Sequence, residues 1–339
     1  MGKLGPMCRC AVLALLLAAC GSGDDDDDGV MEGPEWALLH DAEPAALLSV
    51  WGTSADDVWV VGGRTPEAGP ALLHHDAGSW ERIDVGQPDI DLWSVFGFAG
   101  GDIYFGGSDG RILRYRDGAF EVMTTPPGGP VFGLWGPSED SVWAAGGDGQ
   151  GGGVVWHLEG DEWVDVALPE GVFGQMFKVH GQTDDDVWFS GDDGVTLHWN
   201  GSALEPVDSG TGSPLFSIVT KPDVVIAVGG VPGTSEILEN TGEEGWSAAE
   251  FSAPLPWRGT AAGDGELAFV VGEQGAVAER SATGWTALDQ PLIDLDFHAA
   301  WVDPEGGLWG VGGRFDSGVF TTEGFLLYRG RSSVAEVVP

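Results

Sequence analysis

The sequence predicts an all-β fold, and within that class a seven-bladed β-propeller of four-stranded antiparallel blades. Two observations give the class: the 339 residues include 57 glycines and 16 tryptophans, and the glycines separate short runs rich in Val, Trp and Phe, as turns separate strands. Outside the N-terminal segment no apolar run has helical spacing. The third observation is an internal repeat. Trp59 and Trp309 occupy equivalent positions six intervals apart, which gives about 42 residues per interval, the size of one blade.

The repeat is clearest at Ser49–Gly52 and Asp57–Gly63. A characteristic position in the second strand of each copy is occupied in turn by Trp59, Tyr104, Trp143, Trp188, Ile226, Phe269 and Trp309. A first strand precedes it, and a third strand, a turn and a fourth strand follow. We therefore expect blades at about residues 46–84, 92–123, 131–167, 175–208, 215–251, 257–289 and 296–338, the last together with residues 36–40.

Ring closure follows from the same repeat. A four-stranded sheet of this kind cannot bury both faces alone, so neighbouring blades must cover one another, and a ring leaves no blade uncovered. Trp36–Leu39 precedes the first blade and has the pattern of a fourth strand, whereas Val334–Val338 at the end of the chain lacks the expected aromatic residue. We expect Trp36–Leu39 to complete the seventh blade, with Val334–Val338 as the alternative.

The N-terminus has the pattern of a signal peptide. Within residues 1–19, Lys3 and Arg9 precede an apolar run, Ala11–Leu17, that is too short to cross a bilayer. The run ends in the string LAAC, which resembles the lipobox of bacterial lipoproteins. The resemblance implies that Cys20 is lipidated and that the protein is anchored in the outer membrane, either on its periplasmic face or at the cell surface.

Residues 20–34 are an Asp- and Gly-rich tether that contains five consecutive aspartates, Asp24–Asp28. Such a charge run repels itself and extends. Asp24–Asp28 together with Glu35 also matches the spacing of a calcium loop, but the flanking helices of an EF-hand are missing. We predict a solvated spacer here, and a calcium site is the alternative.

The cysteines and the charge limit the remaining possibilities. Cys8, Cys10 and Cys20 are the three cysteines of the chain, so we expect a propeller without disulfides. Without Lys3 and Arg9, 12 basic residues remain against 54 acidic ones, a formal charge of −42. This charge disfavours nucleic acid and anionic surfaces, and it favours cations or a basic partner. We expect a monomer.

The repeats resemble those of bacterial lipoproteins and secreted proteins with tandem SVWG, DDVW and LHWxG motifs, which are grouped with the Asp-box, kelch-like and WD40-like propellers. The resemblance covers about residues 35–338 and is weakest in the fifth and sixth blades. It implies a propeller that binds a partner through one face of the disc. Ser108–Gly110 is similar to an Asp-box but lacks the Trp that should follow, which counts against a sialidase-like enzyme.

Repeated polar positions are expected to be structural. His74, His157 and His198, with Tyr115, share one register of the third strand, and we expect each to form a hydrogen bond within its own blade. Acidic residues such as Asp57 lie in the turn between first and second strands, and we expect them to cap it.

Departures from the repeat indicate candidate binding residues. The loops after the second strands of the first and seventh blades each contain Gly-Gly-Arg, with Arg64 and Arg314. Because these blades become neighbours on closure, the two guanidinium groups would bind one carboxylate between them. The alternative is that each arginine pairs with nearby acids.

A second departure occurs in the first strand. The position after its aromatic residue is occupied in turn by Ser49, Ser94, Gly133, Lys178, Ser217, Arg258 and His298. This alignment predicts that Lys178, Arg258 and His298 form one ring near the channel mouth, a candidate anion site. Variation within a solvated channel is the alternative.

Motifs for enzyme chemistry are missing from the sequence. It has no paired carboxylates at a motif, no Gly-x-Ser-x-Gly elbow between a strand and a helix, no cysteine after Cys20 and no zinc-binding histidine spacing. We expect no catalytic residue, metal or cofactor. The predicted function is a membrane-anchored, non-enzymatic binding or assembly scaffold of the bacterial cell envelope, whose partner is an envelope protein or a glycan. The alternative is a carbohydrate-binding or glycoside-hydrolase (sialidase-like) propeller.

Overall fold

The computed structural model describes residues 35–242, 245–251, 253–288, 293–314, 322–330 and 334. Residues 34–339 belong to one compact unit. The predicted signal peptide, Cys20 and the Asp24–Asp28 run lie outside the described residues. Within the described part of the chain, no helix has the length and hydrophobicity that a bilayer crossing requires.

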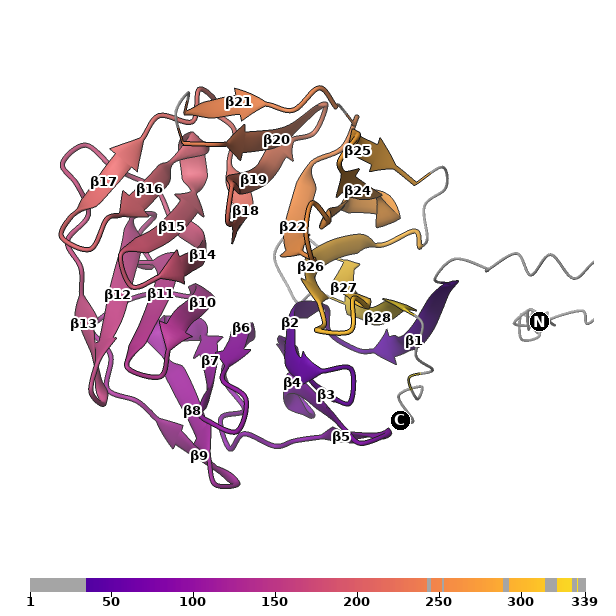
Figure 1. Cartoon of the computed structure of the whole chain (residues 1–339). Helices are drawn as coiled ribbons and strands as arrows, with labels where there is room; N and C mark the ends of the chain where they lie inside the picture. The colour runs from indigo at the N-terminus through magenta and orange to yellow at the C-terminus, as the bar shows by residue number, and fades with distance from the viewer. Residues whose placement is uncertain are drawn as a thin grey trace, which may run out of the picture. The chain divides into compact units, whose positions relative to one another are not determined.

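The described strands form seven antiparallel sheets of four strands each, which confirms the predicted fold class (Figure 1). The first blade contains β2 (Leu47–Ser54), β3 (Asp57–Thr65), β4 (Gly69–Asp76) and β5 (Ser79–Arg82). The second contains β6 (Leu92–Gly97), β7 (Ile103–Gly107), η1 (Ser108–Gly110), β8 (Ile112–Arg116) and β9 (Ala119–Val122). The third contains β10 (Val131–Ser138), β11 (Ser141–Gly147), β12 (Gly153–Glu159) and β13 (Glu162–Asp165).

The next three blades have the same strand order. The fourth contains β14 (Met176–Thr183), β15 (Asp186–Gly191), η2 (Asp192–Gly194), β16 (Thr196–Trp199) and β17 (Leu204–Val207). The fifth contains β18 (Leu215–Lys221), β19 (Val224–Val231), β20 (Thr234–Asn240) and β21 (Trp246–Ala248). The sixth contains β22 (Trp257–Ala262), β23 (Ala268–Gly272), η3 (Glu273–Gly275), β24 (Val277–Ser281) and β25 (Gly284–Ala287).

The seventh blade joins the two ends of the propeller. Its strands are β26 (Asp296–Val302), β27 (Leu308–Arg314), β28 (Thr322–Gly330) and, as the outermost strand, β1 (Glu35–Glu43). β1 runs antiparallel to β28, with Trp36 opposite Arg329 and Leu38 opposite Leu327. The expectation that Trp36–Leu39 completes this blade is therefore confirmed. Of the alternative segment only Val334 is described, and it packs against the apolar cluster between the first and seventh blades.

The inner strands close the ring. Each of them contacts the inner strand of the next blade, and β26 contacts β2. Figure 1 shows them arranged around the centre of the ring. Apolar clusters fill the spaces between neighbouring sheets; one of them packs Val60 of the first blade with Val311 and Leu326 of the seventh. Because each sheet is covered by its neighbours, burial of apolar surface stabilises the ring without a central helix.

The glycine pair at the end of most second strands has a steric cause. A Cβ atom on Gly62 would lie 2.3 Å from the carbonyl oxygen of Ala46, and one on Gly312 would lie 2.0 Å from that of Asp296. A side chain at these positions would separate the first strand from the second where the first strand begins. The repeated glycine therefore keeps the two strands in contact at the channel mouth.

Blades one and four each contain a Trp–His–Asp triad. Asp57 accepts a hydrogen bond from Trp59 Nε1 at 3.1 Å and lies 2.9 Å from His74 Nε2, and the Trp59 and His74 rings stack with centroids 3.7 Å apart. The fourth blade repeats these contacts with Asp186, Trp188 and His198. These histidines thus form hydrogen bonds within their own blades, as expected, and the partner is an aspartate side chain. The role of Asp57 is therefore not limited to capping the turn.

The second and third blades depart from the triad in different ways. In the third, Ser141 replaces the aspartate and lies 3.3 Å from His157 Nε2, while Trp143 Nε1 is buried without a hydrogen-bond partner. In the second, the residue opposite Tyr104 is Arg114, so the expectation that Tyr115 shares the histidine register is wrong by one residue. A shift of one residue places a side chain on the other face of the sheet, and Tyr115 packs instead against Trp59 of the first blade.

Candidate binding site at the channel mouth

Each first strand carries a β-bulge near its beginning, where one residue is skipped in the pairing with the second strand. We call the seven skipped residues the collar: Leu48, Trp93, Phe132, Phe177, Phe216, Arg258 and His298. They line a cavity of about 210 Å³ at the mouth of the channel. A bulge re-aims the extra side chain, and here it directs seven side chains toward the axis.

The aromatic members of the collar form a continuous surface. Ring centroids are 5.2 Å apart between Trp93 and Phe132, 5.7 Å between Phe132 and Phe177, and 5.4 Å between Phe177 and Phe216. Arg258 continues the series, because its guanidinium carbon lies 4.2 Å from the centroid of the Phe216 ring. Such spacings are favourable for aromatic and cation–π pairs. The collar therefore presents a rigid, partly exposed apolar rim.

The collar lies on the side of the propeller where first strands begin and second strands end. Leu47 at the start of β2 pairs with Gly62 near the end of β3, for example. On this side, Phe173 in the loop before β14 is 76% exposed, and Val231 at the end of β19 is 43% exposed. We call this side the collar face. Exposed apolar residues beside an open aromatic rim are typical of a binding surface.

One residue deeper, the first strands resume regular pairing, and Lys178 belongs to this second layer because it lies opposite Ser190. Arg258 and His298 belong to the collar itself. The predicted single ring of these three residues is therefore wrong in register. The error arises because Trp257 and Phe297 look like the collar aromatics of their blades in the sequence. In the structure both are buried before the bulge and do not belong to the collar.

The structure nevertheless brings the three residues together. Lys178, Arg258 and His298 all line a cavity of about 70 Å³ beneath the collar. A larger cavity of about 230 Å³ follows toward the other face, and it is lined by Lys178, His180 and three tryptophans, among other residues. Among the described residues that line these cavities and the mouth there is no Asp or Glu.

The two histidines of the channel are held neutral. The backbone N–H of Thr220 donates to Nδ1 of His180 at 3.1 Å, so the neutral ring of His180 carries its proton on Nε2. Burial, with a smaller effect from Lys178, lowers the pKa of His180 to about 3. Burial also lowers the pKa of His298 to about 3, assisted by the neighbouring Arg258. At neutral pH neither histidine contributes charge to the channel.

Lys178 differs from the other cations of the described chain. All nine described arginines are paired with a carboxylate. Lys221 donates to the carbonyl oxygens of Gly263 and Leu267, at 2.5 and 2.9 Å. The hydrogen bonds and ion pairs found in the described part of the chain give Lys178 no partner, and burial lowers its pKa to about 8. It is a cation in a channel lined without acids.

Arg64 and Arg314 each hold a carboxylate of their own. Arg64 Nη1 lies 2.9 Å from Asp91 Oδ2, and Arg314 Nε lies 2.6 Å from Glu323 Oε2. Pairing with nearby acids, the alternative reading of these arginines, is thus found at both positions. A ligand shared by the two guanidinium groups stays a prediction.

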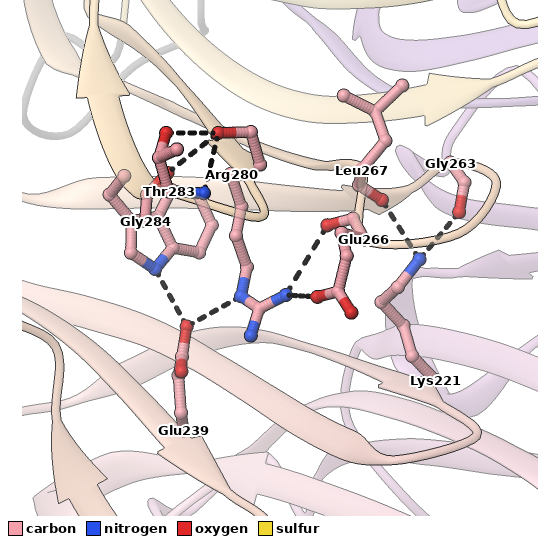
Figure 2. A network of polar contacts seen from close by, with 10 residues as sticks. Lys221, Glu239, Gly263, Glu266, Leu267, Arg280, Thr283 and Gly284 are labelled. Carbon is pink, nitrogen blue, oxygen red and sulfur yellow. Dashed lines mark hydrogen bonds and ion pairs between the residues drawn. The ribbon is translucent and has the colours of Figure 1, made fainter.

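A further cavity, of about 460 Å³, lies at the outer edge between the fifth and sixth blades. Figure 2 shows Arg280 between Glu239 and Glu266, at 2.9 and 2.6 Å. Trp285 Nε1 also donates to Glu239, at 2.8 Å. Because Arg280 is already paired with two carboxylates, this cavity offers less to an anionic ligand than the channel, although it is larger.

The sequence indicated the cations of the channel but not its aromatic residues. In the sequence, the collar aromatics have the pattern of ordinary strand aromatics, which fill the spaces between sheets. They are Trp93, Phe132, Phe177 and Phe216. A bulge leaves no mark in a single sequence other than two bulky residues in succession, as in Leu92-Trp93 and Met176-Phe177. That doublet at the start of the first strands is the signal that points to the collar.

Together these features define a closed seven-bladed β-propeller whose axial channel opens through an aromatic collar. Neither the protein-family models nor the curated proteins include a match to the chain. Solved structures do match. A structure of YCF48 bound to D1 peptide has a TM-score of 0.64 at 16% identity, covering 89% of this chain and 98% of that one.

Two other solved structures, of proteins with different names, match at still lower sequence identity. Virginiamycin B lyase from Staphylococcus aureus has a TM-score of 0.69 at 13% identity, covering 87% of this chain and 99% of that one. The WD40 β-propeller domain of Doa1 has a TM-score of 0.65 at 12% identity, covering 87% and 97%. At such identities the likeness shows the fold alone, and the function must be argued from the site.

Proposed function

We propose that this protein is a non-enzymatic binding module of the bacterial cell envelope, anchored in the outer membrane by a lipid on Cys20, which recognises its ligand on the collar face. The observation that carries the proposal is the collar. Four aromatic side chains and one arginine form a connected, solvent-open rim around a channel. Bulged inner strands hold the rim rigidly, and rigid aromatic anchors are what binding sites use.

The fold is compatible with a polypeptide ligand. YCF48, whose structure is similar, was solved with a D1 peptide. On the present protein, Phe173 and Val231 are exposed apolar residues on the same collar face, as expected if a partner covers more than the channel mouth. This supports an envelope protein as the partner.

A glycan is the second candidate, because the flat apolar faces of sugar rings also pack on aromatic side chains. Most glycoside hydrolases use a pair of carboxylates, and the described residues that line the channel include no Asp or Glu. The glycan candidate is therefore a lectin that uses the same collar.

The test compares three versions of the full chain, all carrying Cys20→Ser to remove the proposed lipid. The first has no other change, the second adds the collar substitution Phe177→Ala, and the third adds Phe120→Ala. Phe120, on the outer strand β9, provides the matched control, since it loses the same side chain away from the channel. We expect Phe177→Ala alone to weaken binding on a glycan array or to a crosslinked envelope partner. Equal binding by all three would contradict the proposal.

A further inference from the structure

We infer that the channel beneath the collar binds a carboxylate carried on an apolar or aromatic body, with the carboxylate at Lys178. This inference rests on the proposed function, because it names the ligand class for the same face, and it adds a site inside the channel. The probe that represents this class is 3-phenylpropionate.

The first argument is electrostatic. In a chain with 54 acidic residues, each described arginine has a carboxylate, yet Lys178 lies among residues that supply none. A partly buried ammonium group without a counter-ion is costly. A bound carboxylate would supply the missing negative charge where the fold supplies none.

The second argument is geometric. The mouth and the 70 Å³ cavity share all seven collar residues, and the 70 Å³ and 230 Å³ cavities share Lys178, Thr260 and Ala300. The three spaces therefore follow one another along the channel, and Lys178 lines both spaces beneath the collar. A carboxylate in the middle space would place an attached apolar group either among the collar rings or beside the tryptophans of the lower cavity. Both positions offer aromatic contacts.

The third argument concerns the type of anion. Arg258 is already paired with Glu273, and His180 and His298 are neutral at pH 7, so Lys178 supplies the one uncompensated charge of the described lining. One charge suits a monoanion better than a phosphate dianion, which prefers clustered arginines. The N–H on Nε2 of His180, another lining residue, is a neutral donor of the kind that a carboxylate also accepts.

The experiment is a calorimetric titration at pH 7 of the full chain with Cys20→Ser. We expect 3-phenylpropionate to bind at least about tenfold more tightly than its neutral amide, because only the acid forms a charge-assisted hydrogen bond. Lys178→Met should reduce the preference to less than about twofold. Lys178→Gln replaces it if the Met variant does not fold. Arg111→Gln removes one positive charge elsewhere on the collar face, where Arg111 pairs with Asp89, and should leave the preference intact.

A peptide ending in Phe, with a free or an amidated C-terminus, identifies the source of the carboxylate. A preference for the free terminus that depends on Lys178 supports a polypeptide end as the natural ligand, and binding of 3-phenylpropionate alone supports a small acid. Equal binding of acid and amide, a preference that survives Lys178→Met, or one lost in Arg111→Gln would overturn the inference. Partner capture that depends on Phe177 without any acid preference would refute this inference and leave the proposed function standing.

Discussion

At the level of single residues, the positive charges of the described chain are mostly neutralised locally. Arg114, for example, lies 2.5 Å from Asp161 and 2.7 Å from Glu121, and Arg82 lies 2.6 Å from the buried Glu43. Lys178 has no such arrangement. Its position in the channel therefore destabilises the folded state, because the ammonium group loses water and no carboxylate compensates for the loss.

Lys178→Met is expected to raise the free energy of unfolding at pH 7 by roughly 2 kcal/mol. A pKa shift of one unit corresponds to about 1.4 kcal/mol, and water in the channel reduces the cost of burying the charge. The pKa of Lys178 falls from its ordinary 10.5 to about 8 on folding, so the folded state binds this proton more weakly. The penalty is complete below pH 8 and disappears as the pH rises from 8 to 10.5. Urea unfolding at pH 7 and pH 10 measures both effects.

The groups that share the channel with Lys178 do not interfere with this comparison. His180 and His298 have pKa values lowered to about 3, and Arg258 is paired with Glu273. Lys221→Met is the matched control. It removes an ammonium group that donates to two carbonyl oxygens, and it should destabilise the protein. A wild type more stable than Lys178→Met at pH 7 would contradict the account.

At the level of elements, the Trp–His–Asp triad links the second and third strands of a blade. Hydrogen bonds to His74 and Thr53 lower the pKa of Asp57 against the opposing effect of burial. Its contribution to stability is therefore present above the ordinary pKa of 3.8 and is lost as the pH falls through the lowered value. The third blade has the tryptophan and the histidine but lacks the carboxylate, which leaves Trp143 Nε1 without an acceptor.

Ser141→Asp is expected to complete the triad of the third blade and to stabilise the protein by about 1 kcal/mol, the net value of a hydrogen bond to a buried donor. It should also raise the pKa of His157, which burial lowers in the native blade. Denaturant unfolding and NMR titration of His157 measure the two effects. The reverse exchange, Asp186→Ser in the fourth blade, is the control and should destabilise. Loss of stability in Ser141→Asp with no change in Asp186→Ser would refute this reading.

The strands could be predicted from the sequence because their residue types repeat at each blade. The exact register could not be predicted, because it depends on a bulge in every first strand. Because the bulges are invisible in the sequence, Lys178 appears equivalent to Arg258 and His298 there. Tyr115 appears equivalent to the histidines in the same way, although a shift of one residue places its side chain on the other face of the sheet. The same bulges create the collar, so the aromatic part of the candidate site was the least predictable from the sequence.

At the level of the whole molecule, closure of the ring depends on a strand from the opposite end of the chain. β1 covers the edge of β28, and its Leu39 is buried in the apolar cluster between the first and seventh blades. The seven repeats predicted the closed ring, and the leftover strand pattern at Trp36–Leu39 predicted how it closes. The ligand could not be predicted in this way, since its site takes one residue from each blade.

Deletion of β1 tests closure. A chain that begins at residue 44 is expected to unfold at least about 10 °C below one that begins at residue 35, because it exposes an edge strand and loses the buried side chain of Leu39. Thermal unfolding followed by near-ultraviolet circular dichroism compares the two. Equal melting temperatures would show that β1 does not hold the ring closed.

Membrane attachment is tested on the full chain in a bacterial host. Cys20→Ser is expected to move the protein from the membrane fraction to the soluble fraction, because a lipidated cysteine with more than one acyl chain binds a bilayer durably. Cys10→Ser, within the predicted signal peptide, is the control and should leave fractionation unchanged. A membrane-bound Cys20→Ser protein would contradict the proposed anchor.

The most direct measurement is a crystal structure of the protein with 3-phenylpropionate. The account predicts the probe in the channel, with a carboxylate oxygen within hydrogen-bond distance of Lys178 Nζ and its ring among the collar aromatics or beside the tryptophans of the lower cavity. A probe bound instead between the fifth and sixth blades beside Arg280, or near Arg64 and Arg314 with the channel empty, would contradict the assignment of the channel as the binding site.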